Sequence, residues 1–235
     1  MDWVDLHVDR GEICGLIGPN GSGKSTFFDC VTGLARPSAG AVKLDGQDIT
    51  GWSLNDIARE GRMLRSFQKT VVFLRAGHRG KPRDRRPDVH LSGIWSTFGI
   101  GAAARNRVAA LRERARELIR IAGLWDVRFQ PAGKLSGGQQ KLIQFASMLM
   151  PEPKLILPRR AHGRHQSQAD RACGREHRLA NTSFGVSFLI IEHNIDVVTS
   201  LCKRVVVLDQ GRKLAEGTPD EIVRNQAVRE AYLGG

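Results

Sequence analysis

"EICGLIGPNGSGKSTFFDCVTGL", residues 12–34, decides the fold of this chain. An apolar strand runs into a glycine-rich turn, and an amphipathic helix follows the turn. Gly18, Gly23, Lys24 and Ser25 occupy the four fixed positions of the pattern G-x-x-x-x-G-K-[ST]. The strand, loop and helix around them are the context that this pattern requires. The stretch therefore predicts a loop that holds the phosphates of a nucleoside triphosphate.

The residue types at these positions suit phosphate chemistry. Glycines let backbone N–H groups turn inward around an anion, and the N-terminus of the following helix adds a favourable dipole. Lys24 would supply a positive charge to the β- and γ-phosphates, and the Ser25 hydroxyl is suited to Mg²⁺. A tight turn alone would also use glycines, but here all four positions and both flanking elements are present. The nucleotide-binding residues that we predict in this loop are Gly18, Pro19, Asn20, Gly21, Ser22, Gly23, Lys24, Ser25 and Thr26.

A second stretch, "LSGGQQKLIQFASMLM" at residues 135–150, has a similar device. Ser136 is placed to cap a helix, Gly137 and Gly138 follow it, and apolar residues then recur at helical spacing. A serine, two bare glycine amides and a helix N-terminus together can bind an anion, although an ordinary capped helix has the same features. One explanation for two phosphate sites in one chain is that each holds a different face of one nucleotide across a dimer.

Four motifs resemble those of ABC ATPases. "GPNGSGKST" and "LSGGQQK" are similar to the Walker A and signature motifs of that family. "SFQ", which ends in Gln68, resembles the Q-loop, and "LIIEH", which ends in His193, resembles the switch-histidine strand. Their order and spacing match over nearly the whole chain. "GAVKLDGQDITG" and the C-terminal residues 208–235 are most similar to the ATP-binding subunits of branched-chain amino-acid importers, and the ATPase of lipopolysaccharide export has a similar tail.

The resemblance implies that two such subunits enclose two ATP molecules. The signature residues Ser136, Gly137, Gly138 and Gln139 would then bind the nucleotide held at Lys24 of the other subunit. Gln68 would sense Mg²⁺ together with Ser25 and couple to the permease, and His193 would hold the γ-phosphate and the attacking water.

By the same implication the cofactors are ATP and Mg²⁺. The implied partners are a second ATP-binding subunit, the membrane permease subunits and, indirectly, a substrate-binding protein. The implied location is peripheral, on the cytoplasmic face of the inner membrane.

The expected fold is an α/β P-loop NTPase core of the ABC type with an inserted helical subdomain. Residues 1–69 and 135–235 are assigned to the core, and residues 70–134 to the subdomain. Strands are expected near residues 11–17, 41–45, 154–157, 186–192, 204–209 and 212–215. Residues 102–124 predict one helix whose apolar stripe faces the subdomain core; the stripe comprises Val108, Leu111, Ala115, Leu118, Ile119 and Ala122.

The start of the chain departs from the family pattern. The family's first strand, and the aromatic residue that usually stacks on adenine, would lie upstream of Met1. Trp3 is too close to the Walker A motif to be a substitute. We therefore expect a chain that is truncated or begins late.

A larger departure follows the apolar run at residues 155–157. There the family has an Asp for the Mg²⁺ shell, a Glu that polarises the attacking water and then a Pro, whereas this chain reads Pro158, Arg159 and Arg160. The degenerate codons of residues 159–170, read one nucleotide later, permit D-E-P-M-A-G-I-N-P-K-L-I, which restores these carboxylates. The same shift in residues 75–88 permits A-L-D-I-x-E-N-L-x-I-A-V-Q-M, the amphipathic segment expected after the Q-loop. We therefore interpret residues 75–91 and 158–178 as frame-shifted segments.

The charge distribution supports this interpretation. The chain has a net charge of +12 and a pI near 10.3, values that ordinarily suggest nucleic acid or an anionic surface as partner. Residues 75–91 and 158–178 each carry six Lys and Arg against two Asp and Glu, and together hold five of the seven histidines. No aromatic residue interleaves with the arginines between Arg75 and Arg86, so a base-stacking platform is lacking. No nucleic-acid partner is expected.

Metal and membrane functions find little support. His162, His165, Cys173 and His177 fit no zinc-binding spacing. No run of about 18 apolar residues and no signal peptide is present, so the chain is expected to be soluble and intracellular.

Three hypotheses remain. The first is the energising ATPase subunit of an amino-acid importer. The second is a nucleotide-binding protein that does not hydrolyse ATP because it lacks the Walker B carboxylates. The third is a nucleic-acid-associated ABC protein. We adopt the first for the ancestry and role of the gene, and we name no catalytic carboxylate.

Overall fold

The computed structural model describes residues 2–66, 102–158, 167–192 and 195–233. The chain divides into two compact units, Met1–Gln68 with Pro151–Gly235, and Lys69–Met150. Residues 135–150, which the sequence assigns to the core, cluster with the second unit. Their assignment to the core, like the other domain boundaries, stays a prediction.

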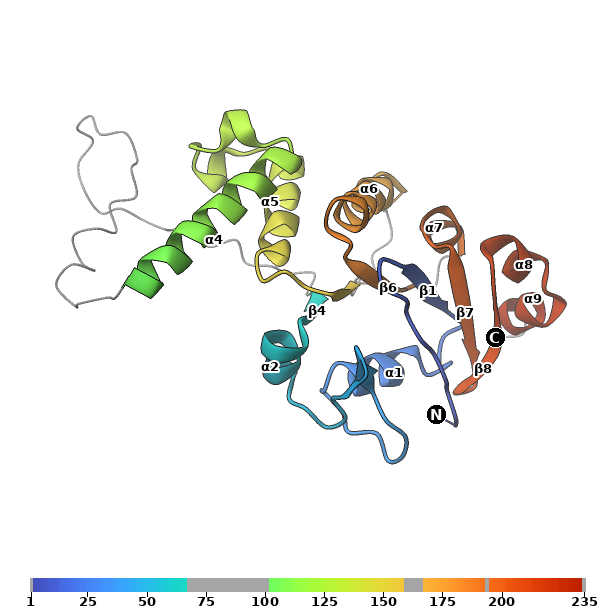
Figure 1. Cartoon of the computed structure of the whole chain (residues 1–235). Coiled ribbons are helices and arrows are strands. Elements are labelled where there is room, and N and C mark those ends of the chain that lie inside the picture. Colours follow the sequence, from blue (N-terminus) through green and yellow to red (C-terminus); the bar gives the residue numbers. More distant parts are fainter. Residues whose placement is uncertain (1, 67–101, 159–166, 193–194, 234–235) are drawn as a thin grey trace. The chain divides into compact units, whose positions relative to one another are not determined.

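A six-stranded sheet forms the centre of the first unit, in the order β4-β5-β6-β1-β7-β8 (Figure 1). All neighbouring strands are parallel except β7 and β8, which are antiparallel. All five residues of β1 are buried, as expected for a strand covered on both faces. The strands are β1 (Ile13–Ile17), β4 (Met63–Ser66), β5 (Leu155–Pro158), β6 (Ser187–Ile191), β7 (Arg204–Asp209) and β8 (Arg212–Gly217).

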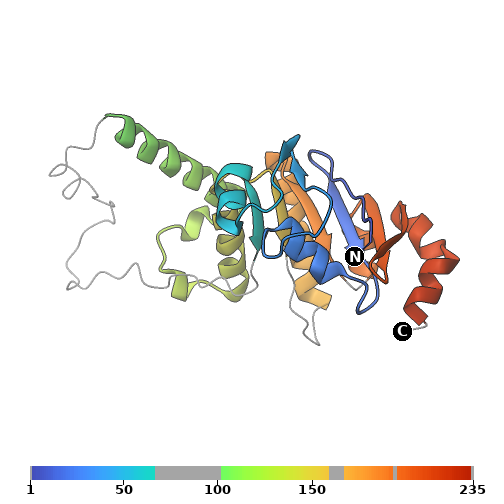
Figure 2. The same ribbon diagram turned by 90° about the horizontal axis from the view of Figure 1, so that it is seen from below.

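Helices cover both faces of this sheet. On one face, α1 (Lys24–Val31) buries Phe27 and Phe28 against side chains of β1, β5, β6 and β7. On the other lie α6 (Ser167–Phe184) and α7 (Ile195–Leu201) (Figure 1). Seen from below in Figure 2, α1 lies in front of the sheet. Two further helices, α8 (Pro219–Arg224) and α9 (Gln226–Leu233), follow β8. The α/β P-loop class is confirmed.

The remaining elements of this unit connect α1 to β4. They are β2 (Lys43–Leu44), β3 (Gln47–Asp48), α2 (Leu54–Asp56) and the π-helical turn η1 (Ile57–Gly61). The structure confirms each strand that the sequence predicts, but β3 and β4 are additional to them.

β4 carries a charged side chain inside the unit. The Arg65 side chain is 2% exposed, and its Nη1 donates to Asp29 Oδ1 at 3.0 Å and to Thr32 Oγ1 at 3.2 Å. Its guanidinium also lies 4.3 Å from the centre of the Phe28 ring. Because Phe28 and Asp29 belong to α1 and Thr32 is its C-cap, Arg65 joins the strand to that helix.

The second unit contains α4 (Ala102–Ile121), the 3₁₀ turns η2 (Trp125–Val127) and η3 (Ala132–Lys134), and α5 (Gly137–Leu149). The helix expected at residues 102–124 is therefore present. The prediction that its whole apolar stripe is buried is wrong. Leu118 is 3% exposed, but Val108 and Leu111 are 40% and 48% exposed, so only the C-terminal half of the stripe meets other residues of the described core. Within the described ranges, no helix has both the length and the apolar character needed to cross a bilayer.

Candidate functional site

The predicted phosphate-binding loop, residues 18–26, leaves the carboxyl end of β1, the strand between β6 and β7. Ligands of parallel α/β sheets bind at this end of the strands. Gly23 precedes α1 in a left-handed conformation, with φ 96°, and no side chain caps this helix. Because the first N–H groups of a helix have no intrahelical acceptor, those of Lys24, Ser25 and Thr26 are suited to an anion.

Lys24 is held over the loop. Its Nζ donates to the carbonyl oxygens of Gly18 and Pro19, at 2.8 and 2.7 Å, and to Ser22 Oγ at 3.2 Å. Burial lowers the pKa of the Lys24 ammonium. These acceptors are all neutral, and a phosphate would give the ammonium a charged partner with shorter, stronger hydrogen bonds. The loop therefore fits a polyphosphate ligand.

The loop also rests on the hairpin of β7 and β8. A Cβ built on Gly18 would lie 2.1 Å from the carbonyl oxygen of Leu208, so this glycine is required by close packing. The Gly211 N–H, in the turn after β7, donates to the Ser22 carbonyl at 3.1 Å. Ser22 is 1% exposed, whereas Ser25, like Asn20, Gly21 and Thr26, is exposed. The side of the loop that packs on the hairpin is thus fixed, while the opposite side is open to solvent.

The signature segment lies in the second unit. Ser136 Oγ accepts from the Gln139 N–H at 3.2 Å, and Gln139 Oε1 accepts from the Ser136 N–H at 2.9 Å. This capping box confirms the predicted helix start. Gly137 and Gly138 are exposed, and a Cβ on Gly137 would meet no atom of the described residues within 4 Å. Packing among the residues that the structure describes therefore does not explain Gly137, and the nucleotide role of Ser136, Gly137, Gly138 and Gln139 stays a prediction.

Several predicted residues lie outside the described part of the chain. These are Gln68, His193, the segment 75–91 and residues 159–166, which include His162 and His165. His177 is 3% exposed, and its ring centre lies 4.8 Å from that of Phe188, so it packs in the core. Among the residues whose placement is described, no group of three or more His, Cys, Asp or Glu could hold a metal ion.

The carboxyl end of β5 carries no acid. Its last residue is Pro158, which pairs with Ser66 of β4. Glu192, which directly follows β6, brings a carboxylate to this end of the sheet and was not among our predicted site residues. It is 6% exposed, and its N–H donates to the carbonyl of Leu16 in β1 at 3.1 Å. The acid directly before His193 in "LIIEH" is the signal that could have identified it.

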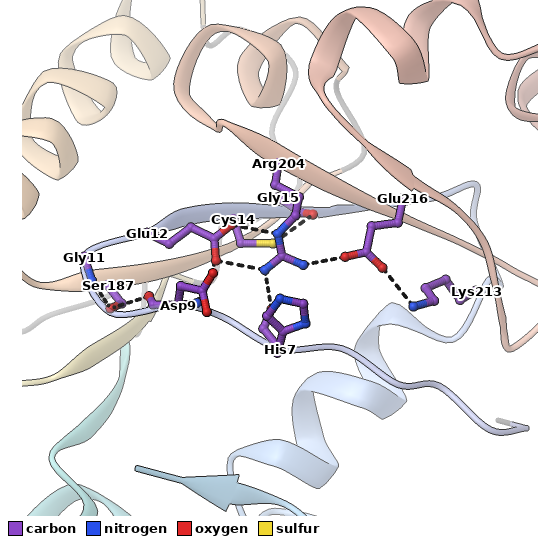
Figure 3. A network of polar contacts seen from close by, with 10 residues as sticks. All are labelled: His7, Asp9, Gly11, Glu12, Cys14, Gly15, Ser187, Arg204, Lys213 and Glu216. Carbon is purple, nitrogen blue, oxygen red and sulfur yellow. Dashed lines mark hydrogen bonds and ion pairs between the residues drawn. The ribbon is translucent and has the colours of Figure 1, made fainter. Parts of the chain in front are cut away.

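A polar network around Arg204 joins the N-terminal segment to β1, β7 and β8 (Figure 3). Arg204 donates to both carboxylate oxygens of Glu12 at 2.8 Å, to Glu216 at 2.5 Å and to the His7 carbonyl at 2.7 Å. Burial by itself raises the pKa of Glu12, but hydrogen bonds from Arg204 and the Asp9 N–H outweigh it and hold that pKa below its ordinary value. The network lies at the amino ends of β1 and β7, whereas the phosphate loop leaves the carboxyl end of β1, so its role is to fix the strands.

Comparison with known proteins gives a consistent result. A family model described as "ABC transporter" matches residues 1–158, and one described as "Branched-chain amino acid ATP-binding cassette transporter" matches residues 212–235. The chain is 33% identical to the high-affinity branched-chain amino acid transport ATP-binding protein BraF of Pseudomonas aeruginosa, over 100% of the chain and 91% of BraF. It is 30% identical to the methionine import ATP-binding protein MetN of Pasteurella multocida, over 98% of the chain and 63% of MetN. The crystal structure of the ADP conformation of MJ1267, an ATP-binding cassette of an ABC transporter, matches with a TM-score of 0.72 at 25% identity, over 99% of this chain and 91% of that one.

Proposed function

Because the chain belongs to the ABC transporter family of ATP-binding proteins, we propose that it is the ATP-binding subunit that energises an importer of branched-chain amino acids. The arrangement of Lys24 over an uncapped helix N-terminus carries the nucleotide part of this proposal. The similarity to BraF and the match at residues 212–235 support branched-chain amino acids as cargo. The similarity to MetN makes methionine the alternative cargo, but the chain spans only 63% of MetN.

ATP would bind with its phosphates on the N–H groups that begin α1 and on the Lys24 ammonium. Mg²⁺ would bind the exposed Ser25 hydroxyl and Gln68, and it would supply charge neutralisation of the phosphates. Ser136, with the exposed amides of Gly137 and Gly138, would meet the nucleotide of a second subunit, and His193 would hold the γ-phosphate. The permease partners would place the protein on the cytoplasmic face of the membrane.

A second candidate function is nucleotide binding without turnover. It is favoured by Pro158, Arg159 and Arg160, which follow the apolar run of β5 in the region where the family resemblance implies the Mg²⁺-shell aspartate and the glutamate. Loss of a positioned general base alone lowers a rate by about 10²–10⁴-fold. The chain as written would therefore bind ATP and hydrolyse it slowly.

Two measurements on one preparation separate these functions. Binding of a fluorescent ATP analogue is measured together with phosphate release, with Lys24→Ala as the control that removes the phosphate-binding ammonium. If the unchanged chain binds the analogue and Lys24→Ala does not, the result supports the nucleotide site. Equal binding by the unchanged chain and by Lys24→Ala would refute it. Rapid phosphate release would refute the second candidate.

Sequencing of the coding DNA across codons 74–91 and 158–178 tests the frame-shift interpretation. A missing or extra base at the edges of these segments would restore the carboxylates and support the hydrolysing subunit. Coding DNA that encodes these segments as they stand in the amino-acid sequence would support the second candidate function, ATP binding with little turnover.

A further inference from the structure

The described residues of the second unit, 102–150, are strongly basic. They contain nine Lys and Arg against three Asp and Glu, whereas residues 2–66 of the first unit contain seven against nine. Residues 102–150 lie outside the two segments that we interpret as frame-shifted, so their charge does not depend on that interpretation. An excess of one sign of charge on one unit attracts a partner surface of the opposite sign.

Helix α4 combines much of this charge with exposed apolar side chains. Arg112, Arg116 and Arg120 recur every four residues and are all exposed, so they form one row along the helix, the arginine row. Val108, one turn before this row, is 40% exposed, and the neighbouring Leu111 is 48% exposed. A helix surface that joins arginines to exposed apolar residues is typical of helices that lie on a membrane or on a partner.

The arginine row ends at a cluster of stacked arginine and aromatic side chains. The Arg120 guanidinium lies 4.3 Å from the centre of the Trp125 ring, and the Arg128 guanidinium lies 4.1 Å from it. Arg128 also lies 4.4 Å from the centre of the Phe129 ring, and its Nη1 donates to the Trp125 carbonyl at 2.5 Å. These four residues are the stacked cluster. Stacking on the rings fixes the two guanidiniums, and the edges of a stacked guanidinium can still donate to an anion.

The charges of the stacked cluster are not compensated by a carboxylate among the residues that the structure describes. The two glutamates of α4 pair with Arg114 and Arg116 instead. Phe129 is 67% exposed, although it lies beside the charged Arg128. This combination suits a bilayer interface, where an aromatic ring can meet the acyl boundary while the cations meet anionic headgroups. Nucleic-acid bases fit less well, because guanidiniums already stack on both rings.

We propose that the second unit binds the surface of an anionic phospholipid bilayer through the arginine row and the stacked cluster, with Phe129 at the boundary between headgroups and acyl chains. The charge of such a surface is continuous, so it can meet the row and the cluster at once, whereas an acidic protein offers carboxylates only at particular points. This inference goes beyond the proposed function, in which the permease partners place the protein at the membrane. It requires no nucleotide.

Vesicle flotation tests the proposal directly. The full chain is mixed, without nucleotide, with vesicles of phosphatidylcholine alone or of phosphatidylcholine and phosphatidylglycerol. We expect binding to the mixed vesicles only, and weaker binding as the salt concentration rises.

Two variants and one control locate the contact. The double variant Arg120→Gln with Arg128→Gln should bind the mixed vesicles about 25-fold more weakly, because each basic residue near an anionic surface contributes about fivefold. Phe129→Ser, which keeps every charge, should bind about 3- to 10-fold more weakly, because no aromatic ring then leaves water. The matched control is Arg36→Gln with Arg224→Gln, which removes two exposed arginines of the first unit and should bind like the unchanged chain.

Several results would overturn the inference. These are equal binding to both kinds of vesicle, an equal loss of binding in both double variants, and unchanged vesicle binding by Phe129→Ser. Polyglutamate or a single-stranded oligonucleotide whose binding the cluster variants abolish, while vesicle binding is unchanged, would replace the bilayer by an acidic protein or a nucleic acid. Binding of the ATP analogue is measured on the same preparation. Its loss with retained vesicle binding would refute the proposed nucleotide binding alone, and the reverse result would refute the bilayer contact alone.

Discussion

Replacement of Arg204 by methionine tests the largest polar network of the first unit (Figure 3). Methionine keeps much of the apolar stem and removes every donor. The Arg204 side chain is 19% exposed, and those of its partners Glu12 and Glu216 are 12% and 26% exposed. The variant therefore leaves two poorly hydrated carboxylates near each other without the cation between them.

The expected loss follows from these contacts. A hydrogen bond to a charged group contributes about 1.5–3 kcal/mol, and removal of one member of a buried ion pair costs about 3–5 kcal/mol. Lys213 still pairs with Glu216 at 2.8 Å, and the sites are partly hydrated, so the lower part of this range applies. We expect Arg204→Met to lower the free energy of unfolding by about 3 kcal/mol at pH 7.

The same variant should respond less to acid. Hydrogen bonds hold the pKa of Glu12 below 4.5, so this residue contributes stability above pH 4.5 that is lost as the pH falls through its folded-state pKa. Hydrogen bonds from Lys213 and then Arg204 lower the pKa of Glu216 in the same way. Without Arg204, burial acts on Glu12 against fewer opposing hydrogen bonds, so its folded-state pKa rises and less stability is lost on acidification.

Urea unfolding at pH 7 and below pH 4.5 measures both effects. The series comprises the unchanged chain, Arg204→Met, Glu12→Gln and the double variant, which together give the coupling energy of the pair. A loss below about 1 kcal/mol at pH 7, the value typical of an exposed pair, would refute the reasoning. An undiminished acid sensitivity of Arg204→Met would refute the electrostatic part.

Three further changes test other parts of the structure. Gly18→Ala should weaken ATP binding more than tenfold while the far-UV circular dichroism is retained, because its Cβ would lie 2.1 Å from the Leu208 carbonyl oxygen; unchanged affinity in calorimetry would contradict this. Asp29→Ala should lower the free energy of unfolding in urea by about 3 kcal/mol, because it removes the carboxylate that pairs with the buried Arg65 cation. Arg65→Met should lower it less, because this change removes the buried cation itself. A larger loss for Arg65→Met than for Asp29→Ala would be incompatible with the buried pair. Ser136→Ala should lower the free energy of unfolding by about 1 kcal/mol, because the capping box of α5 is lost. Full helicity together with an unchanged unfolding midpoint would contradict this expectation.

The sheet was predictable from the sequence where its strands are apolar throughout. β1, β6 and β7 are covered on both faces, so nearly every residue in them is apolar and the run is conspicuous. β4 escaped because Arg65 interrupts its four residues. That charge is compensated by Asp29, which is 36 positions away and recognisable as its partner only in the folded chain.

The strand–loop–helix conformation of the predicted phosphate-binding loop could be foreseen because its parts are contiguous. Loop, lysine and helix start lie within residues 18–26, and local conformation alone brings them together. The supports of the loop were not predictable, since Leu208 and Gly211 come from the far end of the chain. The burial of α4 also depends on tertiary contacts, which is why its stripe at Val108 and Leu111 was predicted incorrectly.

The position of β1 has a consequence for the order in which the protein can fold. β1 (Ile13–Ile17) is synthesised well before its neighbours β6 (Ser187–Ile191) and β7 (Arg204–Asp209). During translation the nascent chain therefore carries an apolar strand with two open edges, a form that is prone to wrong pairing. Pairing across such a sequence distance is intrinsically slow. A chain released before β7 is synthesised would contain the complete Walker A sequence. Its loop would lack the strand that supports it and would not be folded to bind a phosphate.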